Sequence, residues 1–436
     1  MNAPVEVPFP KSFPSAPGVH RGVTSKSPVE KLRATLPSAW GFLFFLGFII
    51  ALGACLRLFL PAGFTGVGFD ENLYRTYIGL LNEAGLLNYP VLIEEFLRNQ
   101  LNPANPAILP PTRLVYILGG AAYQHAFNLQ PLAALHALSC HFSILALVVS
   151  AIFCWRLTHQ RAFTAAVTAL VACAPTQIHL GQHALIDGVF SFWALLAVWL
   201  LWENLRHPND RRWLIAYGAG LAFLVMTKES ASFVFVALLG IIVSNRWLDV
   251  GKVTRLLLIT TFLGAFIGFA AVIVAAGGVE QFALVFSLLQ QKVPVLPYTI
   301  KTGGGPWHRY LVDLILVSPI VVVLAVGNLL QSSGKRTRGE VYLITLCCLM
   351  YTLLASFPGG MNLRYILMLD MPLRVLAASQ LFSLSAHWGR HKTAFLACAL
   401  LFLCAYDLRQ HQVLFAKGGL YELVTEGLLR AQDIMK

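Results

Sequence analysis

Two adjacent carboxylates, Asp70 and Glu71, follow directly on the first long apolar stretch of the chain. Charged groups so close to a membrane are unfavourable unless they bind something. A carboxylate in this position can act as a general base towards a hydroxyl or an amine, and a pair can bind a divalent cation. The alternative is an ordinary solvated pair in a loop. Tyr74 and Arg75 lie within one helical turn and add groups that hydrogen bond and bind phosphate.

A third carboxylate, Asp187, opens a later apolar stretch of the chain. An anion is favoured near the N-terminus of a helix, so Asp187 is either a functional carboxylate or a simple helix cap. His179 and His183 precede it and are four residues apart. They could both ligate a metal if their segment is helical, although a histidine at a membrane interface usually only forms hydrogen bonds.

Two cations stand between apolar stretches further along the chain. Lys228 lies in the short turn Thr227–Ser230, where it can contact a phosphate or simply pair with Glu229 in a hairpin. Arg364, followed by Tyr365, precedes another apolar stretch. Its guanidinium can bind a phosphate through two hydrogen bonds or merely extend to the membrane surface.

The segment Lys301–Tyr310 combines a lysine, three consecutive glycines, Trp307 and His308. Its spacing is not that of a nucleotide-binding P-loop. The glycines make the segment flexible, and Trp307 suits a membrane interface. It is therefore either a mobile lid that contacts a substrate or an external loop with an aromatic belt.

The composition places these polar groups in a membrane protein. Of the 436 residues, 57% are hydrophobic and only 12% are charged, whereas a soluble domain carries about 25% charged residues. The formal charge of +12 does not indicate nucleic-acid binding, because the sequence contains no basic tract with interleaved aromatic residues. All eight cysteines fall in apolar segments without the C-x-x-C spacing of a metal site, so we expect them to be small buried hydrophobes.

The apolar stretches predict an all-α polytopic membrane protein with about eleven spans, within a range of roughly ten to thirteen. Lys and Arg are enriched in cytoplasmic loops, and their positions place the N-terminus inside and the C-terminus outside. This orientation requires that the short apolar segment 113–127 lies along the outer interface and does not cross the membrane. The predicted spans are residues 39–60, 132–155, 163–178, 185–203, 213–227, 230–245, 255–276, 310–330, 341–357, 363–383 and 392–407.

The chain is expected to comprise three parts. Residues 1–37, rich in Pro, Ser and Lys, are predicted to be a disordered cytoplasmic tail. The transmembrane domain covers residues 38–407 and includes an outer loop, 62–131, with interfacial helices. Residues 408–436 form a short tail on the outer side, in which we expect one amphipathic helix, Leu420–Met435.

In this orientation the polar clusters around Asp70, Asp187, Lys228, Lys301 and Arg364 all face the outer side of the membrane. The inner loops are short and contain little besides charge. We therefore expect a single site at the outer leaflet. The sequence contains no internal repeat, which disfavours an inverted-repeat transporter.

These motifs, in this order, resemble those of the GT-C membrane glycosyltransferases, above all the branch of protein O-mannosyltransferases and lipid A aminoarabinose transferases. Each motif is weak alone, whereas the ordered set, over roughly residues 38–407, is fairly specific. The motifs are the acidic pair Asp70-Glu71, the span-opening Asp187, the Gly220–Lys228 turn ending in Thr-Lys, the span entry Gly304–Tyr310 and the late span start Arg364-Tyr365.

The resemblance implies an inverting transfer of a sugar from a polyprenyl-phosphate carrier to a lipid, glycan or protein acceptor, at the outer face of a bacterial inner membrane. Asp70 would then be the base that activates the acceptor, supported by Glu71, which could also help to hold a divalent cation. Asp187 would organise the site, and Lys228 and Arg364 would neutralise the departing carrier phosphate. The other candidate substrate-binding residues are Tyr74, Arg75, His183, Lys301, Trp307, His308 and Tyr365.

The chain departs from the family pattern in two places. The early His-Pro-Pro element reads Leu109-Pro110-Pro111 here, and the tail after the last span is expected to be too short for a recognition domain. The sugar, the acceptor and the need for a metal therefore stay open. An O-antigen polymerase or ligase is a second possible function, disfavoured because the large polar loop is early. A lipid or polysaccharide transporter is a third, for which Asp313 and Asp370 offer the charges within apolar stretches.

Overall fold

The computed structural model of the chain describes residues 39–302, 304–331, 336–357 and 361–435, except for the side chains of residues 297 and 301. The chain divides into two compact units, residues 1–44 and 45–436. The predicted cytoplasmic tail, 1–37, lies outside the described residues. Of the first unit, the structure describes only residues 39–44, at the beginning of helix α2 (Ala39–Phe59). All other described residues belong to the second unit.

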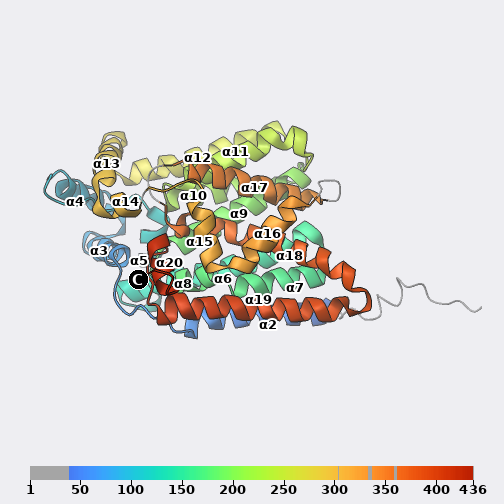
Figure 1. Cartoon of the computed structure of the whole chain (residues 1–436). Coiled ribbons are helices and arrows are strands. Elements are labelled where there is room, and N and C mark those ends of the chain that lie inside the picture. Colours follow the sequence, from blue (N-terminus) through green and yellow to red (C-terminus); the bar gives the residue numbers. More distant parts are fainter. Residues whose placement is uncertain (1–38, 303, 332–335, 358–360, 436) are drawn as a thin grey trace, which may run out of the picture. The chain divides into compact units, whose positions relative to one another are not determined.

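The described residues form helices and connecting turns, with no β-strand among them, as the sequence predicts. The shorter helices α3, α4, α13 and α14 lie together at one end of the long helices of the second unit (Figure 1). The α-helices are α2 (Ala39–Phe59), α3 (Phe69–Ala84), α4 (Pro90–Gln100), α5 (Leu114–Phe127), α6 (Pro131–Thr158), α7 (Arg161–Ala172), α8 (Pro175–Gln182), α9 (Ile186–Arg206), α10 (Arg211–Thr227), α11 (Ala231–Leu248), α12 (Arg255–Ala275), α13 (Val279–Lys292), α14 (Pro297–Thr302), α15 (Arg309–Val317), α16 (Pro319–Leu330), α17 (Arg338–Ala355), α18 (Asp370–Ser385), α19 (Lys392–His411) and α20 (Thr425–Ala431). Shorter helical turns are η1 (Leu86–Asn88), η2 (Val293–Val295), η4 (Leu363–Leu369), η5 (Ala386–His391) and the π-helical η6 (Gln412–Lys417).

Seven of the described helical stretches are long and apolar enough to cross a membrane, or eight if the bent pair α7 and α8 forms one span. The chain is thus a multi-pass membrane protein, whereas the count of eleven spans stays a prediction. Two stretches predicted as single spans, 163–178 and 310–330, are each divided into two helices. Pro175 and Pro319 begin the second helix of each pair, because proline lacks the N–H that would continue the first helix and restricts the residue before it.

Residues 62–131, the predicted outer loop, contain helices α3, α4 and α5, and their place at the membrane interface stays a prediction. Helix α5, which corresponds to the ambiguous segment 113–127, has 14 residues. A span needs about 20 residues, and α5 is not among the helices that could cross. It packs against α6, α3 and α10. Its place along the outer interface stays a prediction.

Helices α10 and α12 pack closely because glycines line their contact. A Cβ atom on Gly264 would lie 2.5 Å from the carbonyl oxygen of Gly218, and one on Gly268 would lie 2.5 Å from that of Ala222. Small residues four apart on a membrane helix permit such an approach of two backbones. The contact fixes α12 against the helix that ends just before Lys228.

The C-terminal tail differs from its prediction. Helix α19 extends to His411 and continues through η6, and the helical path then stops at Gly418 and Gly419. Gly419 has a φ of 58°, a conformation that glycine adopts without strain. The residues that follow are extended, and Leu363 N–H donates to the carbonyl of Leu423 at 3.0 Å. The predicted single helix Leu420–Met435 is therefore wrong, and only α20 within it is an α-helix.

Candidate active site

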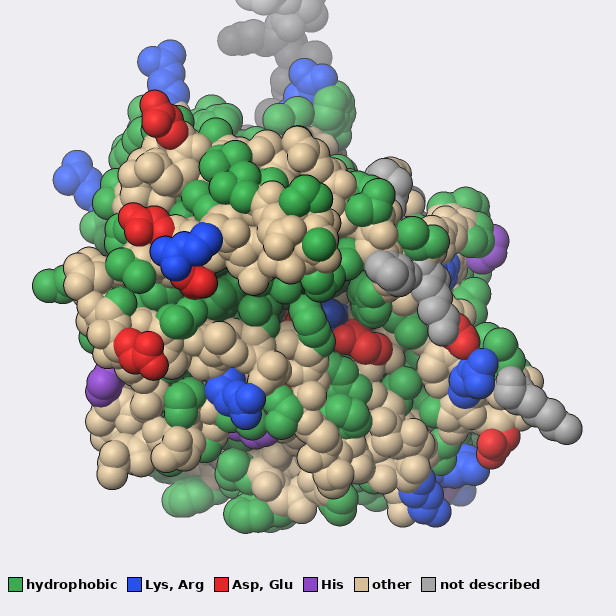
Figure 2. Space-filling view, turned by 90° about the vertical axis from the view of Figure 1, so that its left-hand side faces the viewer, with side chains coloured by type: hydrophobic (Ala, Val, Ile, Leu, Met, Phe, Trp, Pro, Cys, Tyr) green, Lys and Arg blue, Asp and Glu red, His purple; other side chains and the backbone are tan. Residues whose placement is uncertain are grey.

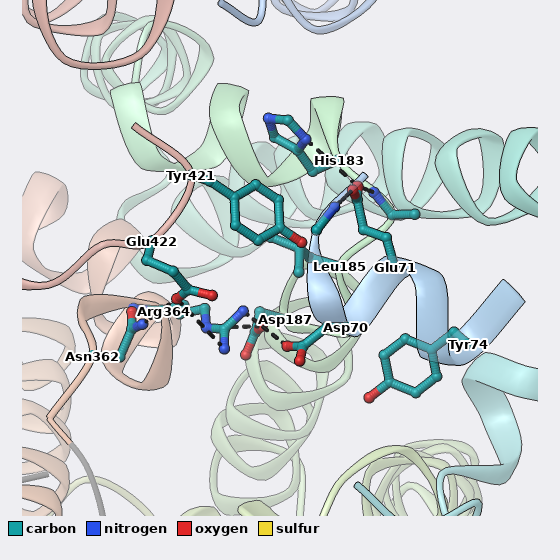
Figure 3. Close-up of polar contacts among 12 residues, drawn as sticks. Asp70, Glu71, Tyr74, His183, Leu185, Asp187, Asn362, Arg364, Tyr421 and Glu422 are labelled. Carbon is teal, nitrogen blue, oxygen red and sulfur yellow. Dashed lines mark hydrogen bonds and ion pairs between the residues drawn. The ribbon is translucent and has the colours of Figure 1, made fainter. Parts of the chain in front are cut away.

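Asp70, Asp187, Lys228 and Arg364 come from four separate elements and meet at one place. Arg364 Nη1 lies 3.1 Å from Asp70 Oδ2, and Arg364 Nε lies 3.8 Å from Asp187 Oδ2 (Figure 3). Lys228 Nζ donates to Asp187 Oδ1 at 2.6 Å. The structure therefore joins these four predicted site residues into one chain of alternating charges.

Lys228 is held rigidly by its surroundings. It follows the last residue of α10 in an extended conformation and turns towards the first turn of α9, which carries Asp187. The Lys228 side chain is 7% exposed and the Asp187 side chain is 2% exposed. Both charges are therefore buried, and each one compensates the other. Lys228 Nζ also lies 4.8 Å from the centroid of the Tyr365 ring, an attractive cation–π geometry.

Glu71 points away from its sequence neighbour Asp70 (Figure 3). Its Oε2 accepts from the N–H of Gly68 at 2.7 Å, and its Oε1 accepts from the N–H of Ala184 at 2.7 Å and faces His136 Nε2 at 3.2 Å. Burial disfavours the ionised carboxylate, but the hydrogen bonds, first among them that of His136, outweigh burial and hold the pKa of Glu71 below its ordinary value. Glu71 thereby fastens the start of α3 to the connection between α8 and α9.

A second ion pair lies beside this chain of charges. Arg113, at the start of α5, contacts both carboxylate oxygens of Glu229, with Nη2 2.9 Å from Oε2 and Nε 3.3 Å from Oε1. Arg113 Nη1 also donates to the hydroxyl of Tyr74. Glu229 therefore pairs with Arg113, whereas its neighbour Lys228 pairs elsewhere. The sequence analysis missed Arg113, whose single signal is an arginine at the start of an apolar stretch.

The C-terminal tail supplies a further carboxylate that the sequence analysis missed. Glu422 Oε2 accepts from Asn362 Nδ2 at 2.7 Å and from the Tyr298 hydroxyl at 3.1 Å. It also lies 3.7 Å from Arg364 Nη2 (Figure 3). No sequence signal distinguishes a glutamate in a short polar tail, because only the folded path of the tail brings it here.

Two cavities share Lys228 as a lining residue. The first, here the polar cavity, has a volume of about 400 Å³, and the second, here the apolar cavity, has a volume of about 530 Å³ and lies among α11, α12 and α13. Figure 2 looks onto this end of the second unit, where acidic and basic side chains lie in a recess. The charged residues of the polar cavity are Asp70, Arg113, Lys228, Arg364 and Glu422, and the aromatic residues of the apolar cavity are Phe235, Phe262, Phe266, Phe269, Phe282 and Phe286.

Several predicted substrate-binding residues lie behind or away from these cavities. Tyr74 is fully buried, and His183 Nδ1 lies 3.5 Å from Glu71 Oε1, behind the start of α3. Arg75 is exposed and donates to the Asn72 side chain, because a helix of 3.6 residues per turn directs a side chain five positions after Asp70 to a different face.

Two predicted substrate-binding residues, Trp307 and His308, lie in the loop before α15. The Trp307 side chain is 66% exposed, and its ring packs edge-to-face on the exposed His308. Neither residue lines the polar or the apolar cavity, because both rings are directed outwards from the start of α15. The side chain of Lys301 lies outside the described residues. Tyr365, by contrast, lines the polar cavity.

The residues near the site do not fit a metal ion. The described part of the chain holds no group of three or more His, Cys, Asp or Glu side chains that could bind one. Both oxygens of Glu71, the candidate ligand, already accept hydrogen bonds from N–H groups, whose partial positive charge disfavours a cation beside them. His179 lies in α8, whereas His183 follows that helix in an extended conformation, so the pair does not form a helical i, i+4 ligand set.

One family model matches this chain. It is described as dolichyl-phosphate-mannose-protein mannosyltransferase and matches residues 109–290, which is less than half of the chain. The matched segment includes Arg113, Asp187, Lys228 and Glu229. Among curated proteins, none matches the chain.

Solved structures share the fold. The oligosaccharyltransferase of Archaeoglobus fulgidus in the apo form superposes with a TM-score of 0.58 at 13% identity, over 86% of this chain and 56% of that chain. The oligosaccharyltransferase AglB from Archaeoglobus fulgidus in complex with an inhibitory peptide and a dolichol-phosphate gives a TM-score of 0.52 at 14% identity, over 86% of this chain and 55% of that chain. ArnT from Cupriavidus metallidurans bound to undecaprenyl phosphate gives 0.52 at 15% identity, over 91% and 77%.

The fold and the family match define the class. The chain has the fold of the GT-C membrane glycosyltransferases, and the resemblance inferred from its motifs is confirmed. It spans just over half the length of the archaeal oligosaccharyltransferase. At such low identities these structures establish the fold alone. Any statement about the activity of this chain therefore has to be argued from the geometry of its own site.

Proposed function

We propose that the protein is an inverting glycosyltransferase that moves a sugar from a polyprenyl-phosphate carrier to a lipid, glycan or protein acceptor at the outer face of the membrane. The observation that carries the proposal is that Lys228 lines both cavities, while Asp70 lines the polar one. A buried cation thus stands where a charged phosphate would join an apolar chain to a sugar. The carriers named in the structures of AglB and ArnT, dolichol-phosphate and undecaprenyl phosphate, support a donor of this kind.

The donor would lie across both cavities. The isoprenoid chain fits the apolar cavity, whose lining is rich in phenylalanine, and its burial there supplies affinity through the hydrophobic effect. The phosphate would then lie at Lys228, with Arg113 and Arg364 on the wall of the polar cavity. The sugar would occupy the polar cavity, within reach of Asp70.

The reaction follows from this arrangement. The acceptor oxygen forms a bond to the anomeric carbon from the side opposite the phosphate, and the bond between that carbon and the phosphate oxygen breaks with its electron pair on the phosphate. Asp70 takes the proton of the acceptor as general base. Lys228 and Arg364 offset the negative charge that grows on the carrier phosphate. Attack from the opposite side inverts the anomeric configuration.

Glu71 and Asp187 act in this proposal as positioning residues. Glu71 fixes the N-terminus of α3, which carries Asp70, through the N–H groups of Gly68 and Ala184. Asp187 holds the ammonium of Lys228 at 2.6 Å. Both carboxylates are almost fully buried, and their contacts orient the residues that face the cavity.

Asp370, one of the two carboxylates that suggested a transport function, gives that function no support. Asp370 contacts Arg374 Nε at 3.1 Å, and the fully buried Arg374 also contacts Asp407 at 2.6 Å. These ion pairs connect α18 to α19, so the Asp370 carboxylate makes a structural contact.

The test is sugar transfer in membranes that contain the wild type or Asp70→Asn, with radiolabelled polyprenyl-phosphate sugars as donors. Loss of a general base should lower turnover by about 10²- to 10⁴-fold. Asp249→Asn is the matched control, because Asp249 forms an exposed ion pair with Arg338 and its side chain is 82% exposed. Equal turnover in all three proteins would overturn the assignment of Asp70.

The orientation has its own test. An Arg338→Cys variant places a thiol at the start of α17, which the topology assigns to the inner side. An impermeant thiol reagent applied from outside should leave this cysteine unlabelled. Labelling from outside would reverse the orientation and remove the site from the outer face.

A further inference from the structure

An extended segment of the C-terminal tail crosses the candidate active site. Residues 419–424, here the C-terminal strap, lie between η6 and α20. His179 Nε2 lies 3.1 Å from the carbonyl oxygen of Tyr421, and Leu363 N–H donates to the carbonyl of Leu423 at 3.0 Å. The strap is therefore held by residues of two separate elements, α8 and η4.

The side chain of Tyr421 seats the strap on the start of α3. A Cβ atom on Gly68 would lie 2.1 Å from the Tyr421 hydroxyl oxygen, so only glycine permits this approach. The Tyr421 ring packs on Phe64 with centroids 4.7 Å apart. Burial, together with the nearby charges of Glu71 and Asp70, raises the pKa of Tyr421, which keeps its hydroxyl protonated. The residue that follows Tyr421 is thereby fixed against the site.

That next residue, Glu422, faces the polar cavity and does not line the apolar one. Within the described part of the chain, the hydrogen bonds of Glu422 come from Asn362 and Tyr298 and all go to Oε2. These donors are neutral and hold the carboxylate in one orientation. The other oxygen, Oε1, belongs to a side chain that is 29% exposed.

The chemistry of the polar cavity assigns Glu422 a partner. In the proposed function the isoprenoid occupies the apolar cavity, the phosphate lies at the cations, and Asp70 serves the acceptor. The sugar of the donor is then the remaining occupant of the polar cavity. Its hydroxyl groups need acceptors, and Glu422 is the remaining carboxylate among the described residues that line this cavity.

We propose, on the basis of the function proposed above, that Glu422 determines which sugar is bound, through hydrogen bonds that its carboxylate accepts from hydroxyl groups of the donor sugar. The sugar class that fits is a neutral hexose or pentose. Glu422 by itself would attract a sugar carrying an ammonium group, but the polar cavity is lined by three cations (Arg113, Lys228 and Arg364) against two carboxylates (Asp70 and Glu422), so the cavity as a whole disfavours a further positive charge.

The experiment measures kcat and KM of the purified full chain for Glu422→Gln and Glu422→Ala. Glutamine keeps an oxygen that can accept from Asn362 and Tyr298, so the strap stays in place, and a thermal unfolding curve checks this. Glu426→Gln is the control, because Glu426 lies on the same tail, pairs with Arg430 and lines neither cavity. We expect KM for a neutral-sugar donor to rise roughly 10- to 100-fold in both Glu422 variants, with kcat changed less, and no change in the control.

Sugar-free polyprenyl phosphate is the second probe. Its binding, measured by inhibition, should be unchanged or tighter in Glu422→Gln, since the variant removes a negative charge near Arg364. An unchanged donor KM, an equal loss of affinity for the sugar-free carrier, or a preference of the wild type for an amino-sugar donor would each overturn the inference. A wild type that turns over no donor would instead contradict the proposed function itself.

Discussion

Lys228 Nζ lies 2.6 Å from Asp187 Oδ1, although 41 residues separate them in the chain. The contact joins the end of α10 to the start of α9. It also compensates the charge of a lysine that lines both cavities. One ion pair therefore serves the stability of the fold and the placement of the cation that would meet a carrier phosphate.

We predict that Lys228→Met lowers the free energy of unfolding by about 3–5 kcal/mol, because it leaves the buried Asp187 without its closest partner. The double variant Asp187→Asn/Lys228→Met removes both charges and should recover most of that loss. Its sugar-transfer activity should remain low, since the cation is still missing. Thermal unfolding of the purified proteins in detergent measures the first effect and donor turnover the second. A double variant no more stable than Lys228→Met would contradict this account of the pair.

A second prediction concerns Glu71 and pH. In Glu71→Gln an NH₂ group replaces one oxygen and must face the N–H of Gly68 or Ala184, which should lower the free energy of unfolding by about 1–3 kcal/mol. The pKa of Glu71 is lowered in the folded protein, so the wild-type advantage is fully present above the unfolded pKa of about 4.3. It should decrease as the pH falls below that value, because the unfolded chain then binds a proton at Glu71 that the folded protein does not bind.

Unfolding temperatures of the two proteins from pH 8 to pH 3 check the prediction about Glu71. The difference should be constant above about pH 5 and shrink below about pH 4. Glu95→Gln is the control, because Glu95 forms an exposed pair with Arg98, and its effect should stay below about 0.5 kcal/mol. A difference that grows on acidification would show that the ionised form of Glu71 is not the stabilising one.

The core of the site could be predicted from the sequence because of what surrounds its charges. Asp70, Asp187, Lys228 and Arg364 each stand next to an apolar stretch, where a charge is rare and unfavourable without a partner. The loop charges then placed all four on one side of the membrane. Which carboxylate faces which cation could not be predicted, because the pairing depends on how separate helices pack.

Arg113 and Glu422 are residues of the site that the sequence alone did not predict. An arginine at the start of an apolar stretch and a glutamate in a polar tail look ordinary, and only tertiary contacts bring them to the polar cavity. Other differences had local causes that the sequence does contain. Pro175 and Pro319 divide two predicted spans, and the helical period turns Arg75 away from the face that carries Asp70.

A third prediction tests the packing of α12 on α10. Gly264→Ala places a Cβ atom 2.5 Å from the carbonyl oxygen of Gly218, and a backbone cannot move aside as a flexible side chain can. We expect the free energy of unfolding to fall by about 1–3 kcal/mol. Gly79→Ala in α3 is the control, because nothing lies within 4 Å of its Cβ position, and it should be neutral or slightly stabilising. Equal unfolding temperatures for the two variants would show that the helices separate without cost.

The last prediction tests the apolar cavity as the site of the isoprenoid chain. Ala265 lies on α12 and lines this cavity, so that Ala265→Trp would fill part of its volume of about 530 Å³. A loss of roughly 55 Å² of buried apolar contact corresponds to about 1.4 kcal/mol, and thus to a tenfold rise in KM for a long-chain donor. A donor with only two isoprene units should be affected much less, because its chain ends before the filled region.

Ile259→Trp is the control, since Ile259 lies on the same helix, is 58% exposed and does not line the cavity. If Ala265→Trp raised KM equally for short and long donors, the isoprenoid chain would have to bind elsewhere.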